Sequence, residues 1–89
     1  MLKPKGLVTK IKNHFTRQRY VVSTIRKGEN LFETAVFAAN FFYIPRSLKR
    51  PALIVETHTQ DDAWETHHQL KVRLTLEMPE RLFQEYRAA

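Results

Sequence analysis

The chain has 89 residues, of which 43% are hydrophobic and 27% are charged, a balance typical of a single globular domain and not of a disordered segment. It contains no cysteine, which excludes a disulfide framework and a thiolate metal site. No apolar run approaches the roughly 18 residues that a membrane span needs, and no signal-peptide core is present, so we expect a protein that is neither secreted nor transmembrane.

Positive charge is concentrated in the first third of the chain. The net charge is +6, and residues 1–30 hold eight Lys or Arg side chains against one Glu, whereas residues 56–89 hold four bases and seven acids. This asymmetry suggests binding to a polyanion or to an acidic partner, with head-to-tail self-association and simple solubility as alternative explanations. The candidate polyanion-binding residues all lie in the basic segment: Lys3, Lys5, Lys10, Lys12, Arg17 and Arg19.

Residues 1–18 are interpreted as a basic N-terminal segment with a short amphipathic helix. Pro4 and Gly6 predict a loose lead-in, after which apolar residues recur at helical spacing. These residues are Leu7, Val8, Ile11 and Phe15. A helix of this length is marginal alone, so its apolar side needs a partner surface. That surface belongs to the same domain, to a neighbouring subunit or, with the lysines facing phosphates, to nucleic acid; the stripe is short for a membrane surface.

Residues 19–89 are interpreted as one α+β domain that begins with a β-hairpin. The segments Arg19–Arg26 and Leu31–Ala38 are rich in β-branched and aromatic residues, and residues 27–30 between them favour a turn. Both sides of the second strand are largely apolar, which indicates a strand that is covered on both faces or takes part in an interface. A third strand is predicted at Ala52–His58.

An aromatic and basic connection is expected between the second and third strands, at residues 39–50. In one interpretation Phe41 or Phe42 fills the core while Tyr43 lies at its rim. In the other, the loop is exposed and binds a protein or stacks on single-stranded nucleic acid. The candidate interaction residues are the aromatic and basic side chains of this loop: Phe41, Phe42, Tyr43, Arg46, Lys49 and Arg50.

The longest segment without proline or glycine follows, and it predicts the central helix. Thr59 is a suitable N-cap, and Asp62 three residues later completes a capping box. One face is formed by residues at helical spacing: Ala63, His67, Leu70, Leu74 and Met78. Val72 and Leu76 point away from that face, so either the helix is contacted on two sides or it ends near His68 and a fourth strand follows.

A short C-terminal helix is predicted for Pro79–Arg87, because proline favours the first helical position and Glu80 suits the first turn. Its apolar stripe would fold it back onto the domain or against a neighbouring chain. The expected fold is therefore α+β: an antiparallel sheet of about three strands, packed by one long helix, with short helices at the N- and C-terminal ends.

Histidines and acids cluster around the start of the central helix, but their spacing does not predict a metal site. His67 and His68 lie about 100° apart on a helix, so they do not converge with His58 on one ion. His67 is interpreted as a half-buried histidine that is hydrogen-bonded to a neighbouring strand. No nucleophile–base arrangement and no glycine-rich phosphate loop are visible. We therefore expect no enzymatic activity, no catalytic or metal-binding residues, no cofactor and no small-molecule substrate.

Two motifs resemble small bacteriophage and prophage proteins of unknown function. The first is Glu33–Phe37, which follows an E-T-x-V-F strand pattern, and the second is Thr59–His67, which follows the helix pattern T-x-[DE]-[DE]-A-x-x-x-H. The sequence departs from that family in having Phe32 where Trp or Tyr often stands, and in its aromatic, basic loop. The resemblance implies a small α+β unit from a phage-type genome, located in the host cytoplasm or the virion, and it implies no catalytic residues.

These features lead to two hypotheses. The first is a non-enzymatic phage-type interaction protein, either a virion or assembly component or a binder of a host or viral protein, with a protein partner or self-association. It rests on the resemblance, on the apolar second strand and on the aromatic loop. The alternative is a basic nucleic-acid-binding accessory protein, which would use residues 3–27 and 46–50 and would bind in a salt-dependent manner.

Overall fold

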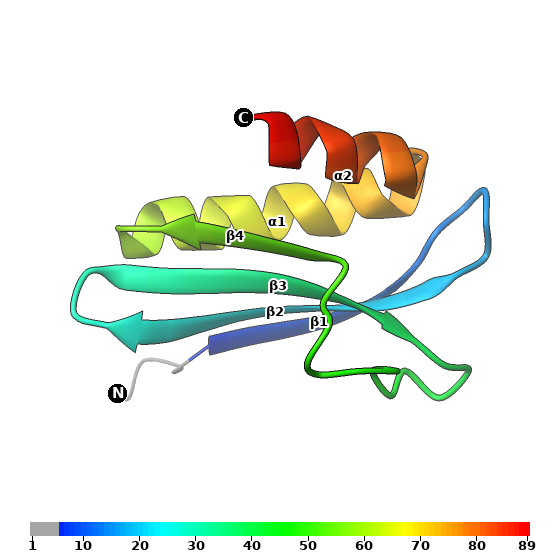
Figure 1. Ribbon diagram of the computed structural model, residues 1–89, viewed down its shortest axis with the longest axis horizontal. Helices are drawn as coiled ribbons and strands as arrows, with labels where there is room; N and C mark the ends of the chain where they lie inside the picture. Colours follow the sequence, from blue (N-terminus) through cyan, green and yellow to red (C-terminus); the bar gives the residue numbers. More distant parts are fainter. Residues whose placement is uncertain (1–5) are drawn as a thin grey trace.

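The computed structural model describes residues 6–89 and shows an α+β fold in which four antiparallel strands are covered on one face by two helices (Figure 1). The strands pair in sequence order, so each strand lies beside its neighbour in the chain. The elements are β1 (Gly6–Lys12), β2 (Arg19–Gly28), β3 (Leu31–Ala39), β4 (Leu53–Thr57), α1 (Gln60–Leu76) and α2 (Pro79–Ala88).

The predicted hairpin is confirmed as β2 and β3, and the third predicted strand is confirmed as β4. In β2 and β3, β-branched residues favour the extended backbone, and Val22 pairs with Val36 at the buried centre. The turn at residues 29–30 follows a register shift between Arg26 and Gly28, a bulge of the kind that increases the local twist.

The short helix expected in the N-terminal segment is wrong, because residues 6–12 form the edge strand β1. So short a segment gains few helical hydrogen bonds alone, whereas β2 offers it a complete pairing partner. In the expected helix, Thr9 would lie outside the apolar stripe. In the strand it points to the helix-covered side of the sheet, beside Ile11. The sheet therefore has four strands, one more than expected, and β1 belongs to the same sheet as β2.

The central helix is confirmed as α1, and no fourth strand follows His68. Thr59 caps the helix, because its hydroxyl accepts a hydrogen bond of 3.1 Å from the backbone N–H of Asp62. The buried face has helical spacing: Ala63, His67, Leu70 and Leu74. Met78 does not continue this face, because α1 ends at Leu76 and Met78 is half exposed at the start of the next helix.

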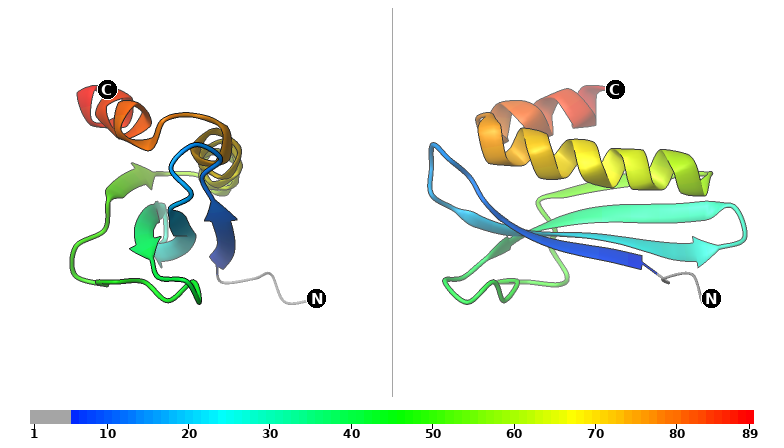
Figure 2. Two further views of the ribbon diagram at one scale, coloured as in Figure 1. Left: turned by 90° about the vertical axis from the view of Figure 1, so that its right-hand side faces the viewer. Right: turned by 180° about the vertical axis from the view of Figure 1, so that it is seen from behind.

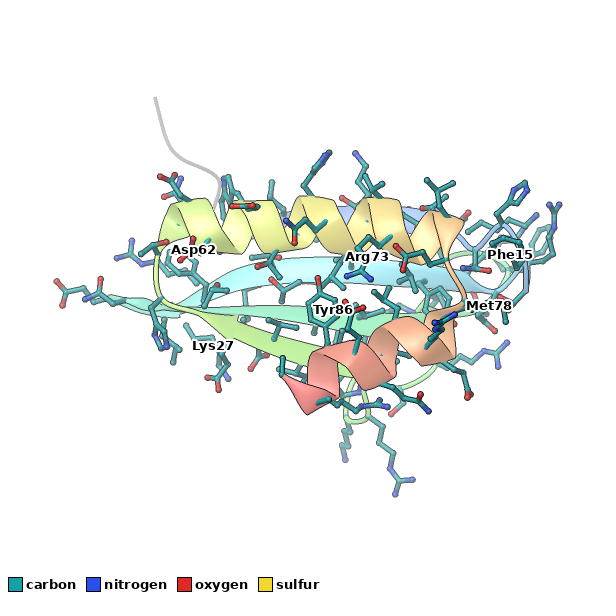
Figure 3. The ribbon with its side chains drawn as sticks, turned by 90° about the horizontal axis from the view of Figure 1, so that it is seen from above. Phe15, Lys27, Asp62, Arg73, Met78 and Tyr86 are labelled. Atoms are coloured by element: carbon teal, nitrogen blue, oxygen red, sulfur yellow. The ribbon has the colours of Figure 1, made fainter. Side chains whose placement is uncertain are left out.

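The C-terminal helix is confirmed as α2, which begins at Pro79 and lies beside α1 on the side of β4 (Figure 3). Phe83 faces the core, where its ring meets that of Tyr20 edge to face with the centroids 6.0 Å apart. Among residues 6–89, neither helix has both the length and the apolar character that crossing a bilayer demands.

The core lies between the sheet and the two helices. It consists of one apolar cluster: Ile11, Tyr20, Val22, Val36, Leu53, Leu70, Leu74, Leu82 and Phe83. A polar network is enclosed beside it, in which buried His67 bonds at 2.8 Å to the hydroxyls of Thr9 and Thr24, and Thr24 bonds to Thr34 at 2.7 Å. The predicted hydrogen bond from His67 to a neighbouring strand is thus confirmed, with β1 and β2 both contributing a partner.

Candidate interaction surface

Within residues 6–89, one face of the sheet carries no helix (Figure 1). Both helices lie on the opposite side, as Figure 2 shows in two further views. Since side chains alternate along a strand and Ile11, Val22 and Val36 face the helices, the residues between them point the other way. We call this surface the helix-free face. It consists of Val8, Lys10, Lys12, Arg19, Val21, Ser23, Ile25, Glu33, Ala35, Phe37, Ile54 and Glu56.

The centre of the helix-free face is apolar. The strand register places Val8, Ser23, Ala35 and Ile54 in one row across the sheet. Val8 is 68% exposed and Ile54 is 50% exposed, and Ile25 is also exposed in the adjoining row. The solvated face of an antiparallel sheet normally carries polar residues, so apolar side chains exposed on three strands indicate a surface that binds another molecule.

The two ends of the helix-free face carry opposite charge. Toward the β2–β3 turn, Glu33 lies opposite Glu56 on the neighbouring strand. At the other end, Lys12 lies opposite Arg19. Desolvation and the neighbouring charges of Arg17 and Arg19 lower the pKa of Lys12. The cations at this end therefore repel one another, and an anionic group bound there would relieve the repulsion.

Asn40 shapes the aromatic loop that joins β3 to β4. Its side-chain oxygen accepts hydrogen bonds from the backbone N–H groups of Phe42 (2.8 Å) and Ile44 (3.1 Å), and Tyr43 takes a left-handed conformation with φ of 60°. The rings of Phe41 and Phe42 point outward and are 70% and 75% exposed. The interpretation that Phe41 or Phe42 fills the core is therefore wrong, whereas Tyr43 is half-buried.

Arg19 joins the basic end of the helix-free face to the aromatic loop. Its guanidinium carbon lies 4.4 Å from the centroid of the Phe41 ring and 5.6 Å from that of the Tyr43 ring, within the range of cation–π attraction. The loop runs on the side of the sheet away from the helices (Figure 1). Two candidate sets that are separate in the sequence, the basic N-terminal residues and the aromatic loop, therefore meet at this side chain.

The remaining basic candidates differ in where they lie. Those of the loop are exposed: Arg46, Lys49 and Arg50. In the part of the chain that the structure describes, the ion pairs use only Lys27 and Arg73 as cations, so no candidate basic residue there is neutralised by a carboxylate. Two candidates, Lys3 and Lys5, fall outside the described residues.

The chemistry that this surface offers is apolar contact, stacking and attraction of anions. The chain matches no protein-family model, no curated protein and no solved structure in the comparisons made. The function is therefore inferred from the residues of the surface. Across residues 6–89, no three histidine, aspartate or glutamate side chains converge as a metal site requires.

The sequence does not single out Val8, Ile25 and Ile54 as one surface, because they lie in three separate segments and only the strand register brings them together. Their signal is weak, because an apolar residue next to other apolar residues, as in Leu7-Val8 and Leu53-Ile54-Val55, does not show which side of the strand it faces. Asn40 has a clearer signal, since asparagine immediately before a non-repetitive segment is typical of an Asx turn.

Proposed function

We propose that the protein is a non-enzymatic interaction protein that associates through the helix-free face and the aromatic loop beside it. The observation that carries the proposal is that Val8, Ile54 and both loop phenylalanines are at least half exposed. Apolar surface gains about 25 cal/mol per Å² when it leaves water. The molecule measures 36 × 29 × 23 Å, so its broad face can supply the roughly 800 Å² per partner of a standard interface.

A second copy of the chain is the partner that charge complementarity favours. Two copies related by a two-fold axis can place the basic end of each face, at Lys12 and Arg19, against the acidic end of the other, at Glu33 and Glu56. Their apolar centres then meet, as in the packing of two sheets face to face. Lys27 forms an ion pair of 3.2 Å with Glu33 and reduces the negative charge at the acidic end without cancelling it.

Light scattering coupled to size-exclusion chromatography tests this proposal. The wild-type protein is expected to be a dimer, and Ile54→Lys is expected to be a monomer, because it places a charge at the apolar centre of the face. Gln84→Lys makes the same change in charge on the exposed surface of α2 and is expected to remain dimeric. A wild-type monomer that also retains no protein partner in a pull-down would contradict the proposal.

The resemblance to small phage proteins supports a setting for this interaction. Three residues of the E-T-x-V-F segment, Glu33, Ala35 and Phe37, lie on the helix-free face, so the motif contributes directly to the proposed interface. We therefore propose a component of a virion or of its assembly, or a binder of a host or viral protein. Mass spectrometry of particles purified from cells that carry the gene distinguishes the first role from the second.

Nucleic-acid binding is the alternative function, and the surroundings of Arg19 favour it. Arg19, its cross-strand neighbour Lys12 and the Phe41 ring form a group that can hold a phosphate and stack a base. Fluorescence anisotropy with single- and double-stranded oligonucleotides at low and moderate salt tests this function. Arg19→Gln is expected to weaken binding and to reduce the salt slope by about one counterion. Absence of binding at low salt would remove the alternative.

A further inference from the structure

We propose that the outer edge of β1 binds an extended acidic peptide of a partner protein as an additional strand of the sheet. β1 forms a border of the sheet, and among residues 6–89 its backbone pairs with β2 alone. An edge strand presents N–H and C=O groups that a further strand can use. The site lies at the border of the sheet and shares only Lys10 with the helix-free face, outside the apolar centre of that face, so it can fail or succeed independently of self-association.

A groove beside β1 can receive the side chains of the added strand. It has a volume of about 300 Å³ and lies between β1 and the last turns of α1, with Ile11, Val72 and Leu76 as apolar lining. Val72 is 40% exposed and Leu76 is 60% exposed, and α2 does not cover them because it packs on the side of α1 nearer β4 (Figure 3). Since alternate side chains of a strand point to the same face, apolar residues at every second position of the peptide reach this groove.

Buried and partly buried hydrogen bonds hold the two walls of the groove in place. Toward one end, Thr9 of β1 bonds to His67 of α1 at 2.8 Å. Toward the other, the side chain of Asn13 donates to the backbone carbonyls of Leu74 (2.6 Å) and Glu77 (2.7 Å). A groove that is already formed loses little entropy when it is occupied, which favours specific recognition of an extended segment.

The positive charge beside this groove determines which kind of peptide it binds. Lys10 from β1 and Lys71 from α1 both line it, and neither forms an ion pair with a carboxylate within residues 6–89. A second copy of β1 is disfavoured, because its sequence GLVTKIK carries two lysines and no acid, and like charges on paired strands repel. In a strand with apolar residues at alternate positions and glutamate or aspartate between them, the apolar residues reach the groove and the acids point to the other face of the sheet, where Lys10 projects. Lys71 at the groove adds positive potential that attracts the same acidic strand.

Two labelled peptides test the proposal by fluorescence anisotropy with the full protein. One has eight residues that alternate between valine and glutamate, and the other has lysine in place of glutamate. The glutamate peptide is expected to bind at least about tenfold more tightly, because complementary charge at the rim selects the partner. Equal binding of the two peptides, or no binding of either, would overturn the proposal.

Backbone methylation separates strand pairing from attraction of charge. The glutamate peptide is made in two further forms, methylated at the valine nitrogens or at the glutamate nitrogens. In an extended strand the N–H groups of the valines all point to one edge and those of the glutamates to the other. Only one edge pairs with β1, so methylation of the nitrogens at that edge is expected to abolish binding, and methylation at the other edge is expected to preserve it. If both forms bind as tightly as the parent peptide, no strand is added and the proposal is wrong.

Variants of exposed residues locate the site. Lys10→Glu combined with Lys71→Glu is expected to reverse the preference toward the lysine peptide, and Val72→Gln is expected to weaken binding of the glutamate peptide by about tenfold. Gln84→Lys serves as the control, because Gln84 lies on the exposed surface of α2, outside both the groove and the helix-free face. Circular dichroism confirms that each variant is folded. An unchanged preference in the doubly reversed variant, or displacement of the peptide by a single-stranded oligonucleotide, would overturn the proposal.

Discussion

Asn13, in the loop between β1 and β2, donates a side-chain hydrogen bond of 2.6 Å to the backbone carbonyl of Leu74, 61 positions later in the chain. The same amide group donates to the carbonyl of Glu77, and its oxygen accepts from the N–H groups of Phe15 and Thr16 at 2.9 Å each. Asn13 is fully buried. A single side chain thus satisfies two carbonyls at the end of α1, which a helix leaves unpaired, and also shapes its own loop.

Replacing Asn13 by alanine is expected to destabilise the fold by about 2–4 kcal/mol, because several buried backbone groups lose their partners at once. Urea unfolding followed by circular dichroism measures the change. Asn13→Asp keeps the acceptor but loses both donors, so it is expected to be almost as unfavourable. His14→Ala, at an exposed neighbouring side chain, is the control. An effect of Asn13→Ala no larger than that of the control would contradict this prediction.

Mild acid is expected to destabilise the protein through His67. Burial of the ring lowers the pKa of His67, and the nearby charges of Lys71 and His68 act in the same direction. In the unfolded chain, His67 takes up a proton with a pKa near 6.5, whereas in the folded protein it does so only at a lower pH. Stability is therefore full above about pH 6.5 and falls as the pH decreases, by up to about 1.4 kcal/mol per pH unit.

Urea unfolding at several pH values between 7.5 and 5 measures this dependence. His67→Gln is expected to be less stable than wild type at pH 7.5 but to lose the histidine-linked change across the range. His68→Gln is the matched control, since His68 is exposed and should leave the dependence as in wild type. If His67→Gln shows the same loss of stability with acid as wild type, another group is responsible.

Phenylalanines in the loop and in β3 are expected to respond differently to substitution. Phe41→Ser and Phe42→Ser should change the free energy of unfolding by no more than about 0.5 kcal/mol, because both rings are exposed. Phe32→Ala should cost about 3–5 kcal/mol, because Phe32 is buried and its ring packs against Trp64 with the centroids 6.1 Å apart. Thermal melts measure the difference, and a loop variant as damaging as Phe32→Ala would show that the loop supports the fold.

Arg73 is expected to hold α2 against α1. Its guanidinium binds Glu77 at 2.8 Å and Glu85 of α2 at 2.6 Å, and it lies 5.9 Å from the centroid of the Tyr86 ring (Figure 3). Arg73→Lys keeps the charge but loses the planar fork that bonds to both carboxylates. Hydrogen exchange of the α2 amides should therefore quicken while that of the first turns of α1 stays unchanged. Arg81→Lys, on the exposed side of α2, is the control, and equal exchange in both variants would contradict the prediction.

The sequence predicts α1 well because its determinants lie within one segment. Thr59 caps the helix, and the inward residues from Ala63 to Leu74 repeat at helical spacing, so no distant contact is needed to decide the structure. The strand β1 cannot be read in this way. Its apolar residues together with Phe15 also fit a helical period, and the pairing with β2 that makes it a strand is not visible in the segment itself.

The candidate site is predictable only in its parts. Arg19 and the aromatic residues of the loop stand out in the sequence by charge and by size. Their meeting depends on β3 pairing with β2, which brings Arg19 opposite Ala39, immediately before the loop. The outward rotation of Phe41 and Phe42 depends in turn on the hydrogen bonds to Asn40, which composition does not reveal.

Because each strand pairs with its neighbour in the chain, most of the sheet can assemble by closing short loops. The entropy cost of closing a short loop is small, which favours early formation of the sheet. The contacts from β1 and its following loop to α1 are different, since Thr9–His67 and Asn13–Leu74 span 58 and 61 positions. We therefore expect the strands to form first and the docking of α1 to complete folding. The groove beside β1 exists only after that last step, so a partner that binds there would bind fully folded molecules and not those in which α1 has yet to dock.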